Sequence, residues 1–119
     1  ISYSQLMTSK LHIDIARACI AEFPNEACGF VDGSVVIPLV NHADDVEESF
    51  VISGEDFLKH DPNTIYHSHP KGDYGFSEQD ILVAANMGLT SYLYVVEMDR
   101  IERYSSTTGV EVFEKILGS

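Results

Sequence analysis

Basic residues are scarce in this sequence. Seven Lys and Arg stand against nineteen Asp and Glu, which gives a formal net charge of −12. Because proteins bind the phosphate backbone of nucleic acids through clustered cations, this charge balance argues against a nucleic-acid partner. A surface this acidic is compatible with a basic protein partner and with good solubility.

Cysteines and long apolar runs are scarce as well. Cys19 and Cys28 are the only cysteines, and their apolar neighbours favour two buried free thiols, in a reducing compartment, over a disulfide. No apolar run approaches the length of a bilayer span, so we expect no membrane partner, and no signal peptide opens the sequence. With 119 residues in all, we expect a single domain, residues 1–119. A start at Ile1 rather than Met is compatible with a domain excised from a longer protein.

The order of the expected elements predicts an α/β or α+β fold in which helices cover one sheet. Capping residues and apolar residues at helical spacing predict helices over residues 4–23, 53–58 and 77–87. Short runs of strand-forming residues predict strands over residues 27–31, 34–40, 49–52, 63–68, 90–96, 101–105 and 110–113. We expect Asp32 and Gly33 to form a two-residue hairpin turn between the first two strands.

The segment Tyr66-His67-Ser68-His69-Pro70 ends one expected strand and carries two histidines two residues apart. Side chains at positions i and i+2 of a strand point the same way, so His67 and His69 face one side together. Ser77 occupies the N-cap position of the next helix, which places the carboxylate of Asp80 in its first turn, near the end of the strand. Two imidazoles and one carboxylate leave a fourth position for water, which is the ligand count of a catalytic rather than a structural zinc.

Simpler interpretations exist for each part of this pattern. Ser-x-x-Asp before an apolar run is also a helix-capping pattern, and a lone buried histidine usually makes a structural hydrogen bond. The capping and metal interpretations are compatible, since Ser77 can cap the helix while Asp80 binds metal. The acidic run 44–48 lacks the ligand spacing and the glycine of a calcium loop, so we interpret it as a solvated loop. The short connection between the histidines and Asp80 favours a metal site over separate structural roles.

A zinc site of this kind needs further groups before it can hydrolyse an amide. Its bound water ionises near pH 7, but a base must take the proton of that water and hand it to the leaving nitrogen. Glu26, between the first helix and the first strand, is the best candidate, although a glutamate in such a connection is usually a solvated surface residue. Ser77 can donate a hydrogen bond to the developing oxyanion.

These residues together resemble the signature of the JAMM (MPN-plus) metalloproteases: an upstream Glu, then His-x-His, seven residues, and Ser-x-x-Asp. Every required position is filled, by Glu26, His67, His69, Ser77 and Asp80. The resemblance also covers Glu-x-Cys-Gly-Phe at the first hairpin and extends over nearly the whole sequence. It implies a cytidine-deaminase-like JAMM/MPN fold, a single curved mixed β-sheet flanked by helices.

The same resemblance implies a zinc-dependent metallopeptidase that hydrolyses a peptide or isopeptide bond with a metal-activated water. His67, His69 and Asp80 would bind Zn²⁺, Glu26 would be the general base, and Ser77 would stabilise the oxyanion. These roles are what the family implies for the matching positions of this sequence.

Within the family, the sequence is similar to compact prokaryotic members, because only a short helix and two tight turns follow Asp80, where eukaryotic deubiquitinases carry an insertion that grips ubiquitin. It most resembles the N-terminal domain of the tail assembly proteins of lambda-like phages, where a cysteine-peptidase domain of the NlpC/P60 type normally follows. The implied partners are a protein or peptide substrate, other tail proteins and such a cysteine-peptidase domain. The implied setting is phage tail assembly or a prokaryotic processing pathway, in the cytoplasm of a bacterial host or in the virion tail.

Two other functions fit parts of the pattern. Two histidines and a carboxylate also form the facial triad of non-haem iron enzymes, but those place their ligands on separate strands of a wider barrel, whereas Asp80 is expected on a helix. A metal-braced assembly or binding module without catalysis would keep the same ligands, but it would need neither an open fourth position nor a nearby glutamate.

Overall fold

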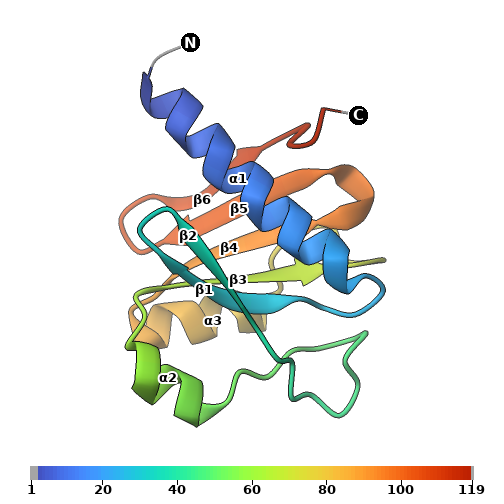
Figure 1. Ribbon diagram of the computed structural model, residues 1–119, viewed down its shortest axis with the longest axis vertical. Helices are drawn as coiled ribbons and strands as arrows, with labels where there is room; N and C mark the ends of the chain where they lie inside the picture. Colours follow the sequence, from blue (N-terminus) through green and yellow to red (C-terminus); the bar gives the residue numbers. More distant parts are fainter. Residues whose placement is uncertain (1–2, 119) are drawn as a thin grey trace.

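The computed structural model describes residues 3–118, with side chains from residue 10 onward. Its elements, in chain order, are α1 (Tyr3–Glu22), β1 (Cys28–Asp32), β2 (Val35–Leu39), α2 (Gly54–His60), β3 (Thr64–His69), α3 (Glu78–Met87), β4 (Thr90–Val95), the 3₁₀ turn η1 (Val96–Met98), β5 (Arg100–Ser105) and β6 (Gly109–Phe113) (Figure 1). The strands form one six-stranded sheet in the order β2-β1-β3-β4-β5-β6. Neighbouring strands run antiparallel except β3 and β4, which are parallel. The predicted fold class, one mixed sheet flanked by helices, is therefore confirmed.

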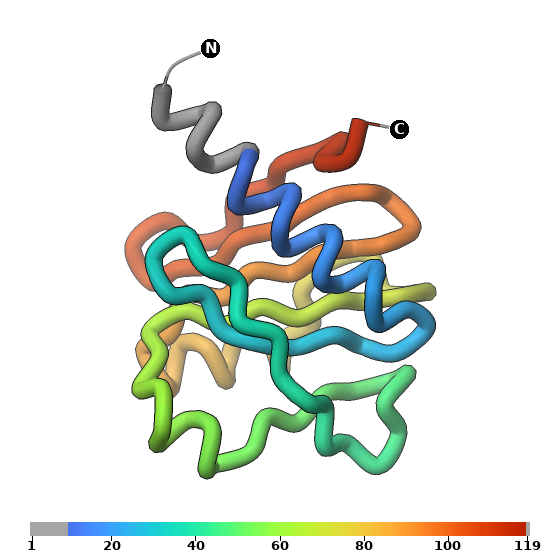
Figure 2. The backbone as a smooth tube through the Cα atoms, in the orientation of Figure 1, coloured from blue at the N-terminus to red at the C-terminus, as the bar shows by residue number. Residues whose placement is uncertain are grey.

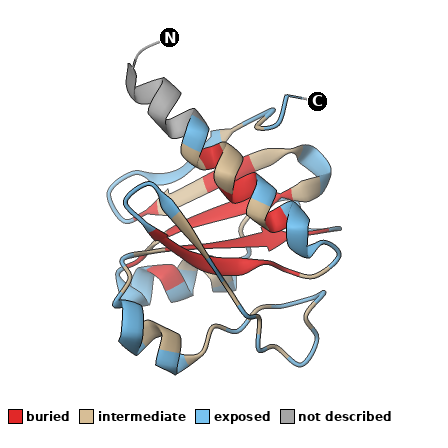
Figure 3. Cartoon of the chain, in the orientation of Figure 1, coloured by how far each residue is buried: buried red, intermediate tan, exposed pale blue. Residues whose placement is uncertain are grey.

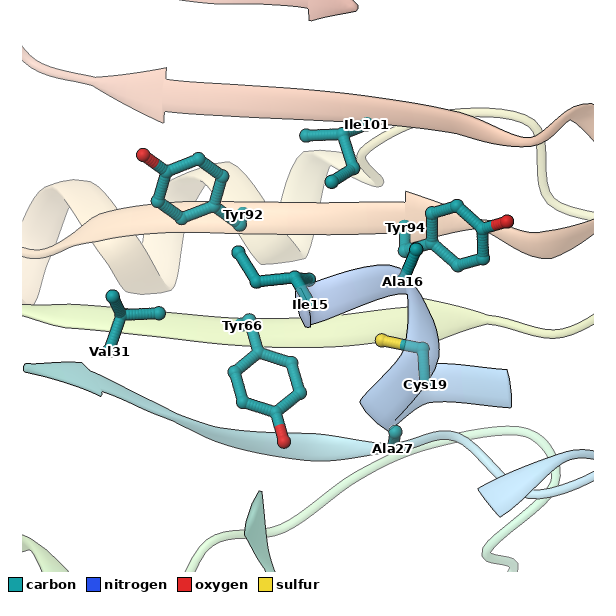
Figure 4. Packing of buried hydrophobic residues seen from close by; sticks show 9 residues of the cluster. All are labelled: Ile15, Ala16, Cys19, Ala27, Val31, Tyr66, Tyr92, Tyr94 and Ile101. Atoms are coloured by element: carbon teal, nitrogen blue, oxygen red, sulfur yellow. The ribbon is translucent and has the colours of Figure 1, made fainter. Parts of the chain in front are cut away.

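One face of the sheet is covered by α1, which runs diagonally across it (Figure 1). A stripe of small and branched side chains on this helix, Ile15, Ala16 and Cys19, packs against Tyr66 of β3 and Tyr94 of β4. Figure 4 shows these side chains meeting over the central strands. Each large apolar side chain buried in this way contributes about 1.5–3 kcal/mol to folding, so this layer fixes α1 on the sheet.

The opposite face of the sheet carries α2 and α3. Phe57 of α2 packs against a second buried cluster, Phe30, Ile65 and Leu89. Successive side chains of a strand alternate between faces, so in β3 Tyr66 points to α1 while Ile65 and His67 point to the other side. The central strands are consequently buried on both faces, as Figure 3 shows.

The histidine segment lies at the end of β3, where the chain leaves the strand to begin the crossover connection to the parallel strand β4. Parallel neighbours cannot be joined by a tight turn, and here α3 makes the connection. The chain leaves β3 at His69, passes through residues 70–77 and enters α3 at Glu78. The N-terminus of α3 therefore lies beside the carboxyl end of β3, the edge of a sheet at which ligands of α/β proteins usually bind.

The strand predicted over residues 49–52 is wrong. This stretch is irregular and belongs to a loop that leaves β2 and passes beside the sheet before it enters α2 (Figure 2). Its backbone groups bond to Asn41 and His42 instead of to a strand: Asn41 Nδ2 donates to the Ser49 carbonyl at 2.9 Å, and the Val51 amide donates to Asn41 Oδ1 at 3.1 Å. A side-chain amide that satisfies the backbone in this way competes with strand pairing.

Cys19 and Cys28 are buried free thiols, as predicted, and burial raises the pKa of the Cys28 thiol to about 12. Within residues 3–118, no helix has both the length and the apolar character that crossing a membrane would require.

Candidate metal centre

The two histidines of β3 and the aspartate of α3 converge as the sequence predicted. His67 and His69 are both buried, at 1% and 6% exposure, and they lie on the same face of the strand. The Asp80 Oδ2 atom lies 3.2 Å from His67 Nε2 and 3.3 Å from His69 Nε2. One ligand atom from each of the three side chains lies within 4.8 Å of the others.

These distances fit a tetrahedral metal site. Zinc binds imidazole nitrogen and carboxylate oxygen at about 2.0–2.2 Å, so neighbouring ligand atoms of a zinc tetrahedron are about 3.3 Å apart. The two separations between the imidazoles and Asp80 have this length. The donor set of two nitrogens and one oxygen also suits zinc and leaves a coordination position for water or substrate. His67, His69 and Asp80 can therefore hold a metal ion.

The capping interpretation of Asp80 is confirmed, and it is compatible with metal binding by the same carboxylate. The Ser77 Oγ atom accepts a hydrogen bond from the Asp80 amide at 3.0 Å, and the Ser77 amide donates to Asp80 Oδ2 at 3.1 Å. This is a complete capping box at the start of α3. The backbone of Ser77 thus helps to hold the carboxylate in the orientation that brings it to the histidines.

The ionisation of the three side chains reflects their burial and their mutual contact. Burial raises the pKa of Asp80, but the hydrogen bonds from His67 and His69 outweigh it and hold that pKa well below its usual range. Burial lowers the pKa of His67 below its ordinary value, in spite of Asp80. Burial also lowers the pKa of His69, but the contact with Asp80 outweighs it, so the pKa of His69 is raised. Because a metal binds only neutral imidazole, protons on His69 compete with metal binding.

The far sides of the two imidazole rings are unpaired within the described chain. The Nδ1 atoms of His67 and His69 are buried and have no hydrogen-bond partner there. In most metal sites this nitrogen donates to a carboxylate or a carbonyl, which orients the ring and strengthens the ligand. The His67 ring is held by packing instead: Phe50 stacks on His67 with ring centroids 4.5 Å apart and an interplanar angle of 22°. The His69 ring meets the His67 ring edge to face, with centroids 5.1 Å apart.

Glu26 reaches the same site from the segment between α1 and β1. It is 6% exposed, and its side chain lines one cavity with His67, His69 and Asp80. The Glu26 amide donates to the Val46 carbonyl at 2.7 Å, and the Glu26 carbonyl accepts from Asn41 Nδ2 at 3.0 Å. The solvated surface glutamate that is usual in such a connection is thus not what the structure contains.

The environment of Glu26 suits a group that exchanges protons near neutral pH. Burial raises its pKa from 4.5 to about 7; His69 opposes the rise, and the charge of Asp80 adds to it. A general base works best when its pKa lies near the working pH. A cation bound by the neighbouring ligands would lower this pKa and favour the carboxylate form.

Two sets of residues that position the site were not predicted from the sequence. Ser68, between the two histidines, accepts a hydrogen bond from the Ala27 amide at 2.8 Å, and its own amide donates to the Ala27 carbonyl at 3.1 Å. These two bonds hold Glu26, the residue before Ala27, beside the histidine strand. The only signal in the sequence is a hydroxyl residue at the middle position of His-x-His.

The second set anchors the loop that leads to Ser77. Glu102 of β5 accepts from the Phe76 amide at 3.3 Å and pairs with Arg100 at 3.0 Å, while Arg100 donates to the Tyr74 carbonyl. Glu102 is 8% exposed. Charged residues in a strand usually face solvent, so nothing in the sequence connects Glu102 with a loop 26 residues away in the chain.

The cavity that contains the candidate ligands has a volume of about 510 Å³. Clefts that enclose small ligands span roughly 300–1,000 Å³, so this one has room for part of a substrate as well as a metal ion. The ligands therefore face an open cleft rather than a closed core.

Comparison with known proteins identifies the family. A family described as prokaryotic homologs of the JAB domain matches residues 8–107. No curated protein matches the sequence. Among solved structures, a protein of Desulfitobacterium hafniense, known from its solution structure, matches at a TM-score of 0.56 with 22% sequence identity, over 85% of this chain and 84% of that protein. At this identity the structural match supports the fold alone.

Proposed function

Because the chain belongs to the prokaryotic homologs of the JAB domain, which confirms the resemblance to the JAMM family, we propose that it is a zinc-dependent metallopeptidase that hydrolyses a peptide or isopeptide bond. The observation that carries the proposal is the convergence of His67, His69 and Asp80 in an open cleft that Glu26 also lines. A metal that only braced the fold would need neither the cleft nor the acid.

His67, His69 and Asp80 would hold the zinc ion in this proposal. A zinc ion bound there would supply Lewis-acid chemistry, polarising the scissile carbonyl and the attacking water. Asp80, whose pKa is held well below its usual range, offers its carboxylate to the metal throughout the neutral range. His69 must lose its proton before it can serve as a ligand.

Glu26 is the general base of the proposed reaction. Its carboxylate takes a proton from the attacking water and transfers it to the nitrogen of the departing amine, so the same side chain acts first as a base and then as an acid. Burial raises the pKa of this carboxyl to about 7 in the metal-free protein, and a cation bound by the neighbouring ligands would lower it again. Glu26 would then be ionised before it accepts the proton, as a general base must be.

Ser77 stabilises the negative charge that develops on the carbonyl oxygen. Its Oγ atom already accepts a hydrogen bond from the Asp80 amide, but a hydroxyl also has one proton that it can donate. The capping role and the oxyanion role are therefore compatible in the same side chain. A single hydrogen-bond donor of this kind raises kcat by a factor of about 10²–10³.

The test combines metal analysis with peptide hydrolysis. Purified protein should carry about one zinc per chain, as a single three-ligand site implies, and should cleave members of a mixed peptide library in a chelator-sensitive way. His67→Ala should lose both metal and activity, whereas Glu26→Gln should keep the metal and lose activity. Glu55→Gln, which changes an exposed carboxylate of α2, is the control and should match the wild type.

Two results would refute parts of this proposal. If Glu26→Gln cleaves as fast as the wild type, Glu26 is not the base. If metal-loaded wild type cleaves no peptide or isopeptide at all, the metal braces an assembly or binding module instead.

The proposal extends to the biological setting. By its resemblance to compact prokaryotic members and to phage tail assembly proteins, the chain would process a protein or peptide in the cytoplasm of a bacterial host or in a virion tail. Its partners would include other tail proteins or a cysteine-peptidase domain. The neighbouring genes test this directly, because flanking tail genes would support the phage setting and their absence would favour a cellular pathway.

A further inference from the structure

The cleft at the candidate metal centre has a polar end and an apolar end. The polar end contains the proposed metal ligands together with Glu26 and Ser77. The apolar end is lined mainly by apolar side chains, those of Ile52, Phe57, Ile65, Val83, Met87 and Leu89, with the buried Ser91 on the strand next to Ile65. The proposed chemistry uses only the polar end, so the apolar end requires a separate explanation.

Half of the apolar residues that line the apolar end, here called the apolar wall, belong to β3 and α3, the two elements that carry the proposed metal ligands. In β3, Ile65 lies two residues before His67 and therefore on the same face, about 6–7 Å away along the strand. In α3, Val83 and Met87 lie three and seven residues after Asp80, on the same side of the helix and about 4–5 and 10–11 Å further along its axis. The apolar end of the cleft thus begins at Ile65 and Val83, the apolar residues that lie next to the ligands His67 and Asp80 on β3 and α3.

Part of this wall is exposed. Val83 is 37% and Met87 is 52% exposed, although both line the cleft. Groups of exposed apolar side chains in a concave site commonly mark a ligand surface.

We propose that the apolar end of the cleft binds a large apolar side chain of the substrate, such as Leu, Ile, Met or Phe, next to the bond that is cleaved. This inference rests on the proposed peptidase function. Neighbouring Cα atoms of a peptide are 3.8 Å apart, so a residue adjacent to a bond held at His67 and Asp80 can place its side chain between Ile65 and Val83.

Charged side chains are excluded from the same position. An acidic side chain would enter a cleft whose other carboxylates are Glu26, Glu48, Asp73 and Asp80, and like charges repel. A basic side chain would lose its hydration against the apolar wall without a paired carboxylate at that end. The enzyme should therefore select by size and apolarity at this position.

The experiment compares two synthetic peptides that differ at one position beside the cleavage site, one with Leu and one with Ala. We expect the wild type to cleave the Leu peptide about 10- to 100-fold faster in kcat/KM, the usual range for discrimination in an apolar pocket. Val83→Glu and Met87→Glu should each reduce the preference to less than about threefold. Leu82→Glu is the matched control, because Leu82 is 49% exposed on the same helix but does not line the cleft.

A binding measurement separates this inference from the proposed peptidase activity. In the Glu26→Gln variant, the Leu peptide should shift the amide resonances of Val83 and Met87 at lower concentration than the Ala peptide does. Adding Val83→Glu should abolish that difference. Because Val83 and Met87 are partly exposed, both variants should fold, and circular dichroism checks this.

The outcomes distinguish the two proposals. Equal cleavage and equal binding of the two peptides would overturn the apolar-site inference, even if both are hydrolysed. Retention of the Leu preference in both Val83→Glu and Met87→Glu would also overturn it. Preferential binding of the Leu peptide at α3 without cleavage of any peptide would support the apolar site and refute the peptidase.

Discussion

Replacing Glu26 with Gln should stabilise the metal-free protein at pH 8 while it removes the proposed base. Glu26 is buried among polar and apolar groups, and burial raises its pKa from 4.5 to about 7. An ionised carboxylate is therefore unfavourable at this position when no cation is bound. Gln has nearly the same shape and carries no charge, so it removes the unfavourable term and keeps the packing.

The size and sign of the effect follow from the two pKa values. Between pH 4.5 and 7 the unfolded chain ionises Glu26 while the folded protein keeps it protonated, so the stability of the wild type falls as the pH rises through this interval. The full difference corresponds to about 3 kcal/mol. Glu26 lines a cleft that opens to solvent, and screening reduces the expected gain to about 1–2 kcal/mol at pH 8.

Urea unfolding in the presence of a chelator measures this gain. At pH 8 the midpoint of Glu26→Gln should exceed that of the wild type by about 1 M urea, and the difference should shrink towards zero near pH 4.5. Glu55→Gln should show no such pH-dependent gain. An equal midpoint for Glu26→Gln and wild type at pH 8, or a difference that does not vary with pH, would refute the assignment of a raised pKa to Glu26.

Three further substitutions test the positioning of the site and of the strands that carry it. Ser77→Ala should lose about 1 kcal/mol of stability with the helix cap and about 10²–10³ in kcat while the zinc content stays unchanged; an unaltered kcat would exclude the oxyanion role. Glu102→Ala should lower the free energy of unfolding, measured in urea, by about 3 kcal/mol, because it leaves the partly buried Arg100 without its carboxylate partner. Hydrogen exchange at the Phe76 amide should accelerate in this variant, and exchange at the wild-type rate would contradict the anchoring role of Glu102. Gly29→Ala should destabilise the fold by about 1–3 kcal/mol or more, since a Cβ there would overlap the Ile37 carbonyl oxygen and the Tyr66 ring, and a thermal midpoint equal to that of the wild type would show that this close approach does not constrain the sheet.

Much of the site could be predicted because its rules are local. The spacing of His67 and His69 determines that they share a strand face, and the spacing of Ser77 and Asp80 determines a capping box at a helix start. Both statements depend only on the periods of a strand and a helix. The order of strands and helices also predicted one sheet with helices on it, because that order restricts the possible folds. The resemblance to the JAMM family implied that the sheet is mixed.

The remaining features depend on residues that are distant in the chain. Residues 49–52 have the composition of a strand, but the Asn41 side chain takes up their backbone hydrogen bonds. The burial of Glu26 requires Ser68 to hold Ala27, and the loop before Ser77 requires Glu102. No sequence period connects these partners.

The sequence by itself determined which side chains share a face and which residues begin the helix that carries Asp80. Only the tertiary structure decided that Glu26 is buried with a raised pKa and that the ligand faces of β3 and α3 continue into one apolar wall. The reason is physical: side-chain direction follows from the local backbone, whereas desolvation and enclosure depend on every element that packs around a group.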